Sequence, residues 1–302
     1  MVVTSRAPVR IDFAGGWTDV DIFAKGAGGA VLNAAIDKYV TGRLEVLDGS
    51  VGTTGELQDG IKLSYQSELP AGSGLGTSSA LNVVWLSLVK SRITSVEDKK
   101  TIANLAYELE AILGILGGKQ DQYASALGGF NFMTFGEEVG VETLDVPRDV
   151  IEELESRLVL CYTGKPRLSG NIHENVWGAY RKGVPETVTA LYSLRNIAFS
   201  MRYVLLSGKL DEFAELLNQN WDCQKKLDAS ITNEQIEELF DETLKQGAVA
   251  GKACGAGGGG CLLFLTETGR RDSVEQVVER LGSRVIPFKF EFEGLRIQDS
   301  GG

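Results

Sequence analysis

The sequence has few of the residues from which metal clusters and disulfide frameworks are built. It has one histidine, His173, which excludes a multi-histidine metal site and leaves any Ser-His-Asp triad dependent on that residue. No C-x-x-C pair occurs among its four cysteines, which are Cys161, Cys223, Cys254 and Cys261. A zinc cluster is therefore not expected, and a chain of this length does not need disulfides, so we expect reduced thiols.

The sequence also lacks long apolar runs and an excess of basic residues. No run approaches the ~18 apolar residues of a membrane span, and the N-terminus lacks the apolar core of a signal peptide. There are 30 Lys and Arg against 41 Asp and Glu, a net charge of −11. A sequence-independent nucleic-acid binder needs a basic face. We therefore expect a cytoplasmic protein with no membrane or nucleic-acid partner, in which local cations and backbone N–H groups bind any anionic substrate.

The length and the order of the predicted elements indicate two domains of the α+β class. A chain of 302 residues exceeds the usual size of one domain. Between residues 140 and 157 the sequence becomes acidic and carries Pro147, so we expect domains at 1–155 and 156–302. Strands are expected at 9–13, 30–35, 39–46, 61–65, 130–135, 158–162, 261–266 and 285–292. Helices are expected at 78–89, 95–116, 170–182, 186–207, 209–218, 233–246 and 271–281.

A glycine-rich segment, Leu69–Ala80, is the strongest motif. Its sequence, LPAGSGLGTSSA, leads directly into an apolar helix. Three glycines let the backbone approach a ligand closely, and the hydroxyl side chains lie where the helix N-terminus attracts an anion. A glycine turn with a simple serine N-cap is the alternative, but one cap needs one hydroxyl and not four. The segment is not a Walker A loop, because no Gly-Lys-Ser/Thr follows.

Two further segments give this motif a family context. Ala7–Asp19 reads APVRIDFAGGWTD, and Lys252–Gly260 reads KACGAGGGG. Together with the glycine-rich segment they resemble, in order, the three motifs of the GHMP kinases, the superfamily of galactokinase, homoserine kinase and mevalonate kinase. The segments GKQDQY at 118–123 and YTGKPRLS at 162–169 resemble its branch of heptose-phosphate kinases and fucokinase-like proteins.

The resemblance implies a fold, an activity and a set of ligands. The fold is an N-terminal α/β domain like that of ribosomal protein S5, followed by a C-terminal α+β sandwich. The activity is transfer of a phosphoryl group from ATP, with Mg²⁺, to a hydroxyl of a sugar or sugar phosphate. The residues expected to bind the nucleotide are Pro70, Gly72, Ser73, Gly74, Leu75, Gly76, Thr77, Ser78 and Ser79. Whether the chain forms a homodimer stays open.

Two residues are expected to hold the metal. By resemblance the first is Ser78, and oxygen ligands are those that Mg²⁺ prefers. The helix after Ser95 offers Glu108 and Glu110 as the partner carboxylate. At 100° per residue Glu110 shares a side with the apolar stripe, where a lone carboxylate is costly unless it binds a cation. Both this geometry and the resemblance favour Glu110, against the alternative of a solvated surface glutamate.

The resemblance also assigns the chemistry of the acceptor hydroxyl. Asp121, which we expect in a turn just after the helix, matches the aspartate near that hydroxyl. It either removes the proton or only orients the hydroxyl, because a loose transition state needs little help from a base. Lys119 is close enough in sequence to lower the pKa of Asp121. Arg10 matches a basic position near the transfer centre, with a surface ion pair as the alternative.

Sugar binding is expected from the first and third motifs and from the turn at 163–169. The expected substrate-binding residues are Asp19, Trp17, Gly16, Arg167, Ser169, Gly257 and Gly258. Trp17 either stacks on a sugar or fills the core, whereas Arg167 can grip a phosphate with two N–H groups. His173 is expected to be a helix-start residue and Cys254 to be inert.

The expected reaction is phosphorylation of the anomeric C1 hydroxyl of a heptose 7-phosphate. A kinase for a free sugar such as fucose is the first alternative. A catalytically silent sensor of sugar or nucleotide is the second, and Ser78, Glu110 and Asp121 argue against it. A kinase for mevalonate or an amino-acid alcohol is the third, and the polar Thr-Asp and Arg-Leu-Ser segments favour a polyol instead.

Overall fold

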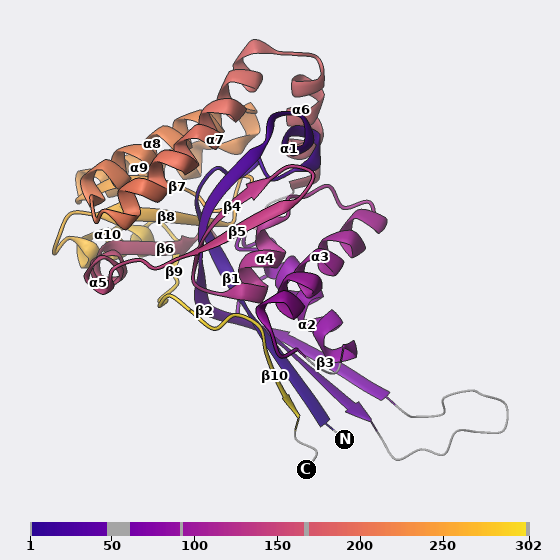
Figure 1. The fold of residues 1–302 in the computed structure, drawn as a ribbon. Coiled ribbons are helices and arrows are strands. Elements are labelled where there is room, and N and C mark those ends of the chain that lie inside the picture. The colour runs from indigo at the N-terminus through magenta and orange to yellow at the C-terminus, as the bar shows by residue number, and fades with distance from the viewer. Residues whose placement is uncertain (1, 47–60, 91–92, 166–168, 300–302) are drawn as a thin grey trace, which may run out of the picture.

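The chain folds into two antiparallel sheets with helices packed around them, which is the α+β class that the sequence predicts (Figure 1). The computed structural model describes residues 2–46, 61–90, 93–165 and 169–299. The strands are β1 (Val2–Ala14), β2 (Gly29–Val46), β3 (Ile61–Ser67), β4 (Phe130–Phe135), β5 (Val139–Leu144), β6 (Leu158–Tyr162), β7 (Ala248–Ala253), β8 (Cys261–Thr266), β9 (Arg284–Val285) and β10 (Arg296–Asp299).

Ten α-helices and one 3₁₀ helix lie within the described residues. They are α1 (Asp21–Ala27), α2 (Thr77–Val89), α3 (Val96–Ile112), α4 (Gln120–Leu127), α5 (Arg148–Arg157), α6 (Ser169–Arg181), α7 (Pro185–Leu206), α8 (Leu210–Lys225), η1 (Ala229–Ile231), α9 (Glu234–Lys245) and α10 (Arg271–Arg280). Helices α2, α3 and α4 lie together on one side of β1 and β2 (Figure 1). Helices α7, α8 and α9 lie on the other side, beside the second sheet.

The first sheet is organised around two long, paired strands. Its order is β10-β1-β2-β4-β5, with β3 also paired to β2. The strand β10, at the end of the described chain, pairs with β1 at its beginning, so the two ends of the described chain lie side by side (Figure 1). Residues 296–299 thus belong to the sheet that the first half of the chain forms. The domain boundary at 155/156 stays a prediction.

The second sheet is made entirely from the later part of the chain. Its order is β7-β8-β6-β9, and every pair in it is antiparallel. The helix α8 packs on β7 and also contacts β1 of the first sheet. Because β7 leads into the glycine tract of the third motif, the second sheet brings that tract toward the strand that carries the first motif.

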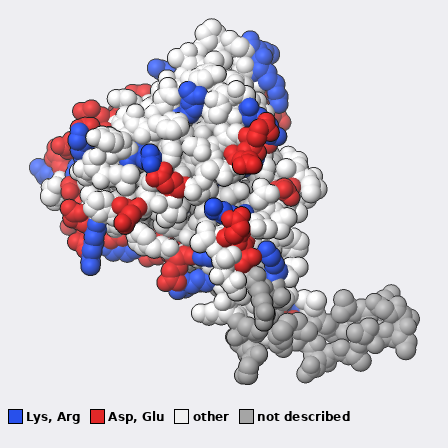
Figure 2. Space-filling view, viewed as in Figure 1, with Lys and Arg blue, Asp and Glu red and all other residues white. Residues whose placement is uncertain are grey.

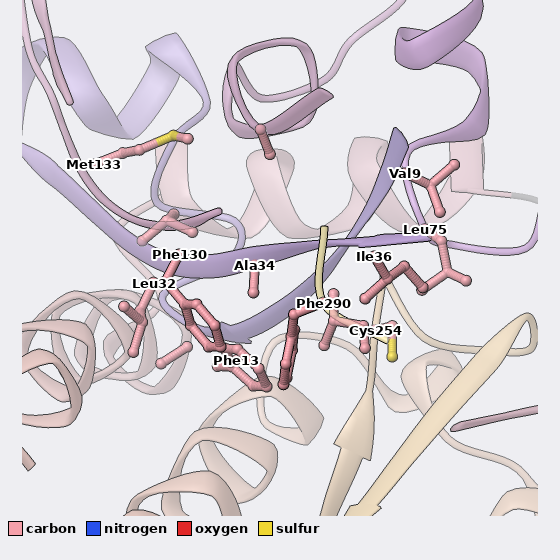
Figure 3. Packing of buried hydrophobic residues seen from close by; sticks show 14 of the residues in the cluster. Val9, Phe13, Leu32, Ala34, Ile36, Leu75, Phe130, Met133, Cys254 and Phe290 are labelled. Atoms are coloured by element: carbon pink, nitrogen blue, oxygen red, sulfur yellow. The ribbon is translucent and has the colours of Figure 1, made fainter. Parts of the chain in front are cut away.

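A cluster of aromatic rings fixes β1 in place (Figure 3). Phe13 stacks on Phe130 of β4 with ring centroids 6.2 Å apart, and it meets the edge of Phe213 on α8 at 5.5 Å. Phe290, from the returning C-terminal segment, lies 4.5 Å from Phe130. Full burial of each such side chain contributes about 1.5–3 kcal/mol. The cluster therefore anchors the strand on which the first motif lies.

The helix predicted over 95–116 begins as expected and ends early. Ser95 and Asp98 form the predicted capping box. The helix α3 ends at Ile112, because Gly114 adopts a left-handed backbone with φ of 74° and the Ile115 N–H bonds back to the Glu110 carbonyl, a glycine C-cap. The apolar stripe continues past this point, but Leu113 is exposed.

Other boundaries also differ from the sequence prediction. The closing strand predicted at 285–292 is wrong: β9 stops at Val285 before Pro287, which has no N–H to donate, and β10 begins at Arg296. Helices α1, α4 and α5 and strands β5 and β7 were not predicted, and α8 continues seven residues beyond the predicted end at 218.

The surface carries both signs of charge on the face shown in Figure 2. Blue and red side chains are interspersed there, and no broad basic field covers this face. None of the helices in the described residues is both long and apolar enough to cross a membrane.

Candidate active site

A cavity of about 300 Å³ brings together residues from all three motifs. Its walls come from β1 and the turn after it, the glycine-rich loop, the starts of α2, α4 and α6, and the tract after β7. The described residues lining it include Arg10, Asp12, Gly16, Trp17, Asp19, Gly72, Ser73, Gly74, Gly76, Thr77, Ser78, Ser79, Glu110, Gly117, Gly118, Gln120, Asp121, His173, Cys254 and Gly255. Most of the site residues predicted from the sequence therefore meet at one place.

The glycine-rich loop depends on backbone conformations that glycine allows. Gly72, Gly74 and Gly76 have φ of 75°, 81° and 76°, in the left-handed region. A Cβ on Gly74 would stand 3.4 Å from the Gly255 nitrogen, and the Cys261 N–H donates to the Ser73 carbonyl at 2.7 Å. The glycine tract after β7 therefore packs against this loop.

The loop delivers three hydroxyl side chains to the first turn of α2. Thr77 starts the helix, and its hydroxyl lies 2.9 Å from that of Ser73. Ser78 is exposed toward the cavity, whereas Ser79 is buried. The first N–H groups of a helix have no partner within it, and this end carries the positive pole of the dipole. The arrangement suits an anionic group such as a phosphate.

Arg10 and Asp121, which both line the cavity, form an ion pair. Two guanidinium nitrogens of Arg10, Nε and Nη2, lie 2.7 and 2.6 Å from the Asp121 Oδ1. Nη1 donates to the carbonyls of Gly74 and Cys254, so one side chain contacts all three motifs. Burial lowers the pKa of Arg10, but the carboxylates of Asp121 and Asp12 outweigh it and raise that pKa above its usual value. The alternative of a surface ion pair for Arg10 is wrong.

Asp121 differs from the prediction in its secondary structure. It lies in the first turn of α4 and not in a turn just after α3. A Cβ on Gly76 would stand 3.0 Å from the Asp121 Oδ2, so the glycine leaves room for the carboxylate. Lys119 forms its ion pair with Asp21, at 2.9 Å, and Arg10 is the cation beside Asp121.

Asp19 is a buried carboxylate with a strongly raised pKa. Its Oδ2 accepts the Gln120 N–H at 3.1 Å, and a Cβ on Gly118 would stand only 1.8 Å from the same oxygen. Burial raises the pKa of Asp19 to about 7, with the charges of Asp121 and Asp12 adding to the effect against the Gln120 hydrogen bond. Asp19 is therefore protonated more easily than an ordinary aspartate.

Glu110 is on the buried side of α3, as the helical geometry predicts. It is 5% exposed, whereas Glu108 is exposed and accepts a hydrogen bond from Asn104. Its carboxylate accepts hydrogen bonds at 2.8–3.0 Å from Ser79, Asn82 and Gln122. Burial raises the pKa of Glu110 above its usual value, although these hydrogen bonds act to lower it. The hydroxyl bonded to Glu110 is that of Ser79, while Ser78 lines the cavity beside it.

A second buried ion pair, between Asp12 and Lys252, is not predicted by the sequence. Lys252 is fully buried, and its Nζ donates to the Asp12 Oδ2 at 2.6 Å and to the Asp12 carbonyl at 2.7 Å. The pair joins β1 of the first sheet to β7 of the second. The alternation of β1 could have pointed to Asp12, since it lies on the same face as Arg10.

Trp17 packs against aromatic neighbours and also borders the cavity. Its ring lies 4.5 Å from that of His173 and 6.0 Å from that of Trp177, and it is 6% exposed. Its φ of 80° is unusual for a residue that is not glycine. His173 lies near the beginning of α6, as expected, but it also lines the cavity, which the sequence does not predict.

Several other predicted site residues are not among those that line the cavity. Gly257 and Gly258 are not among the lining residues: a Cβ on them would meet Ile231 and Ser230, so they pack against η1. Pro70 and Leu75 are also not among the lining residues. Arg167 is outside the described residues, and Ser169 is the first residue of α6.

Comparisons with protein families match both halves of the chain. Residues 38–129 match the N-terminal domain of GHMP kinases, and residues 201–286 match the GHMP kinases C-terminal family. A D-glycero-alpha-D-manno-heptose 7-phosphate kinase of Campylobacter jejuni is 30% identical over 97% of this chain and 98% of its own. A bifunctional fucokinase/GDP-fucose pyrophosphorylase of Arabidopsis thaliana is 27% identical, over 86% of this chain and 29% of its own.

Solved structures also resemble this chain over nearly its whole length. The crystal structure of a D-glycero-D-manno-heptose 1-phosphate kinase from Bacteroides thetaiotaomicron has a TM-score of 0.77 and 28% identity, and the match covers 99% of this chain and 100% of that one. Lactococcus lactis galactokinase, with a TM-score of 0.71 and 19% identity over 98% and 95% of the two chains, shares the fold.

Proposed function

Because the chain belongs to the GHMP kinases and is an ATP-dependent sugar kinase, we propose that it phosphorylates the anomeric C1 hydroxyl of a heptose 7-phosphate. The observation that carries this proposal is the 30% identity, over nearly the full length of both chains, to a heptose 7-phosphate kinase. A free-sugar kinase acting on fucose is the second candidate, and the 27% identical fucokinase supports it over a smaller share of the chain.

Asp121 and Arg10 are the proposed catalytic residues. Asp121 would accept the proton of the attacking hydroxyl or orient that hydroxyl toward the phosphoryl group. Arg10 would fix the position of the Asp121 carboxylate through two nitrogens and offset negative charge at the transfer centre. The loop from Gly72 to Gly76 and the hydroxyls at the start of α2 would hold the nucleotide phosphates.

Ser78 and Glu110 are the proposed ligands of Mg²⁺. In the described part of the chain no group of three or more His, Cys, Asp or Glu could hold a metal by itself. Mg²⁺, however, is usually bound by one or two carboxylates together with substrate phosphates and water. A carboxylate and a hydroxyl at the cavity wall fit that donor set. When bound, the ion would neutralise charge on the phosphates during transfer.

The charges along the cavity also support a requirement for added cations. Among the lining residues that the structure describes, Asp12, Asp19, Glu110 and Asp121 are acidic, and Arg10 is the one Lys or Arg. Two phosphorylated substrates in one cavity would therefore repel these acids without a metal ion and further basic groups.

The turn at 163–169 is the proposed source of the further basic group. The Gly260 N–H donates to the Lys165 carbonyl, and His173 lines the cavity, so both flanks of the turn lie near the site. Arg167 and Ser169 would bind the 7-phosphate. Asp19, Gly16 and Trp17 would contact the sugar, whereas Gly257 and Gly258 would support the tract from behind.

The product and one variant test this proposal. Phosphorus–proton coupling in the NMR spectrum of the product should place the new phosphate on C1. Replacement Arg167→Ala should raise KM for the sugar phosphate about 10-fold or more and leave KM for ATP nearly unchanged, because a charged hydrogen bond to phosphate is lost. An unchanged KM for the sugar phosphate would remove Arg167 from the site, and a phosphate on another carbon would refute the proposed reaction.

A further inference from the structure

Asp12 is a cavity residue to which the proposed reaction gives no role. It lies two residues from Arg10 on β1, so the two side chains point to the same side of the strand. Both line the cavity. A rise of about 3.4 Å per residue places them about 7 Å apart along the strand. Asp12 therefore lies beyond the transfer centre, next to the region proposed for the rest of the sugar.

The Asp12 carboxylate is fixed in place but keeps capacity to accept hydrogen bonds. Lys252 donates to its Oδ2 at 2.6 Å and also to its backbone carbonyl. The other oxygen, Oδ1, is buried and has no hydrogen-bond partner among the described residues. A buried acceptor without a partner costs free energy, so such groups are nearly always satisfied, by protein, water or ligand.

Gly16 opens this carboxylate to the cavity. A Cβ at Gly16 would stand 2.5 Å from the Asp12 Oδ2, so any other residue would cover it. Gly16 itself lines the cavity. The charge of Asp12 also acts on its neighbours, raising the pKa of both Arg10 and Asp19. The carboxylate is thus close to Arg10, a proposed catalytic residue, and to Asp19, a proposed sugar contact.

We propose that Asp12 accepts a hydrogen bond from a sugar hydroxyl other than the one that is phosphorylated, and that it thereby determines sugar specificity. Lys252 is the positioning residue, because it holds the carboxylate toward the cavity. An ionised carboxylate only accepts hydrogen bonds, so it selects a group that donates one. The inference rests on the proposed function in one respect, that the cavity binds a sugar.

A double-mutant cycle between residue 12 and the sugar hydroxyls tests the proposal. We would measure kcat/KM of wild type and Asp12→Asn with the best sugar substrate and with analogues in which each hydroxyl other than the phosphorylated one is replaced in turn by hydrogen or by fluorine. For one hydroxyl, kcat/KM of wild type should fall at least ~10-fold with either analogue, because neither hydrogen nor fluorine at that position can donate a hydrogen bond to Asp12. In Asp12→Asn, the fall in kcat/KM on replacing this hydroxyl should be smaller than in wild type, and the effects of replacing the other hydroxyls should stay the same.

Two controls separate specificity from a structural role. Asp145→Asn removes an exposed carboxylate outside the cavity lining, and it should leave the ratio of kcat/KM between substrate and each analogue unchanged. The double variant Asp12→Ala/Lys252→Met removes the ion pair without leaving a buried charge unpaired, and it should abolish the same discrimination. If kcat/KM of Asp12→Asn falls by the same factor with the substrate and with every analogue, Asp12 has only a structural role and the inference is overturned. Absence of turnover of any sugar by wild type would instead refute the proposed function.

Discussion

At the residue scale, the site is held by charged side chains that bridge segments far apart in the sequence. Arg10 contacts Asp121, Gly74 and Cys254, and Lys252 contacts Asp12 across 240 residues. Each cation is buried and each is paired, as buried charges must be. Removing one partner of such a pair costs about 3–5 kcal/mol. Substitutions at the site should therefore keep the shape of the residue that they replace.

Asp121→Asn keeps that shape and removes the charge. We expect kcat to fall by about 10²–10⁴ if Asp121 acts as the base, with a smaller change in nucleotide affinity. Steady-state kinetics over a range of pH measures both. Turnover near that of wild type with an unchanged pH profile would exclude Asp121 from the chemistry.

Glu110→Gln tests the metal site against a neighbour on the same helix. If Glu110 and Ser78 hold Mg²⁺, the variant should lose at least ~100-fold in turnover and need more Mg²⁺ for half-maximal rate. Its hydrogen bonds from Ser79, Asn82 and Gln122 can persist in part, so the fold should survive.

The matched control is Glu108→Gln, which changes an exposed carboxylate two residues before Glu110 on α3. It should alter turnover little, because Glu108 faces solvent beside Asn104. Equal losses in the two variants would contradict the assignment of Glu110 by its helix face.

Residues assigned from a local pattern were located correctly, and those that depend on tertiary contacts were not found. The 3.6-residue period of α3 was enough to place Glu110 inward and Glu108 outward. The pairing of Asp12 with Lys252 has no local signal, because the two sheets create it. Lys119 was expected near Asp121 from its sequence distance, but the first turn of α4 directs it to Asp21.

At the element scale, the segment between α3 and α4 lines the cavity beside Asp19. Gly114 ends α3, and the chain then runs past Asp19 before α4 begins at Gln120. Gly118 passes so close to the Asp19 carboxylate that a side chain there has no space. The segment therefore holds Asp19 against the Gln120 N–H.

Gly118→Ala should disturb this packing, whereas Gly117→Ala should not. A Cβ at Gly118 would stand 1.8 Å from the Asp19 Oδ2, but a Cβ at Gly117 has no neighbour within 4 Å. We expect Gly118→Ala to lower the free energy of unfolding by about 1–3 kcal/mol. The change for Gly117→Ala should stay within about 0.5 kcal/mol. Urea unfolding of both variants measures the difference, and equal stabilities would contradict the packing of this segment.

Predictions of elements failed where tertiary contacts override local pattern. Strand-like residues 285–292 do not form one strand, since the segment crosses from β9 to the first sheet and touches it at the Ile36–Phe290 bridge. The helix α4 was read as a turn because its eight residues lack an apolar stripe of their own. It is buried by β1 and α3, which no local pattern reveals.

At the scale of the whole molecule, burial of acids in the cavity couples stability to pH. The pKa of Asp19 is about 7 in the folded chain, against 3.8 for an ordinary aspartate. Between these values the folded state binds a proton that the unfolded state has lost. The stability contributed by Asp19 is therefore full below about pH 4 and is lost as the pH rises through 7.

Asp19→Asn removes this titration. The free energy of unfolding of the variant minus that of wild type should rise by about 2 kcal/mol between pH 5.5 and pH 8, at 1.36 kcal/mol per pH unit up to 7. Denaturant unfolding of both proteins over this range measures it. A difference that is independent of pH would mean that Asp19 ionises normally.

The central claim is that this acidic cavity works as a sugar-phosphate kinase site, with ATP on the glycine-rich loop and the phosphorylated sugar near the turn at 163–169. The most direct measurement is ADP release by wild type with ATP and Mg²⁺ across free hexoses, free heptoses, hexose phosphates and heptose 7-phosphate. The account predicts the highest kcat/KM for heptose 7-phosphate, at least ~10-fold above every free sugar, because a charged contact to the phosphate is lost without it. Free hexoses used as efficiently as the heptose phosphate would contradict it.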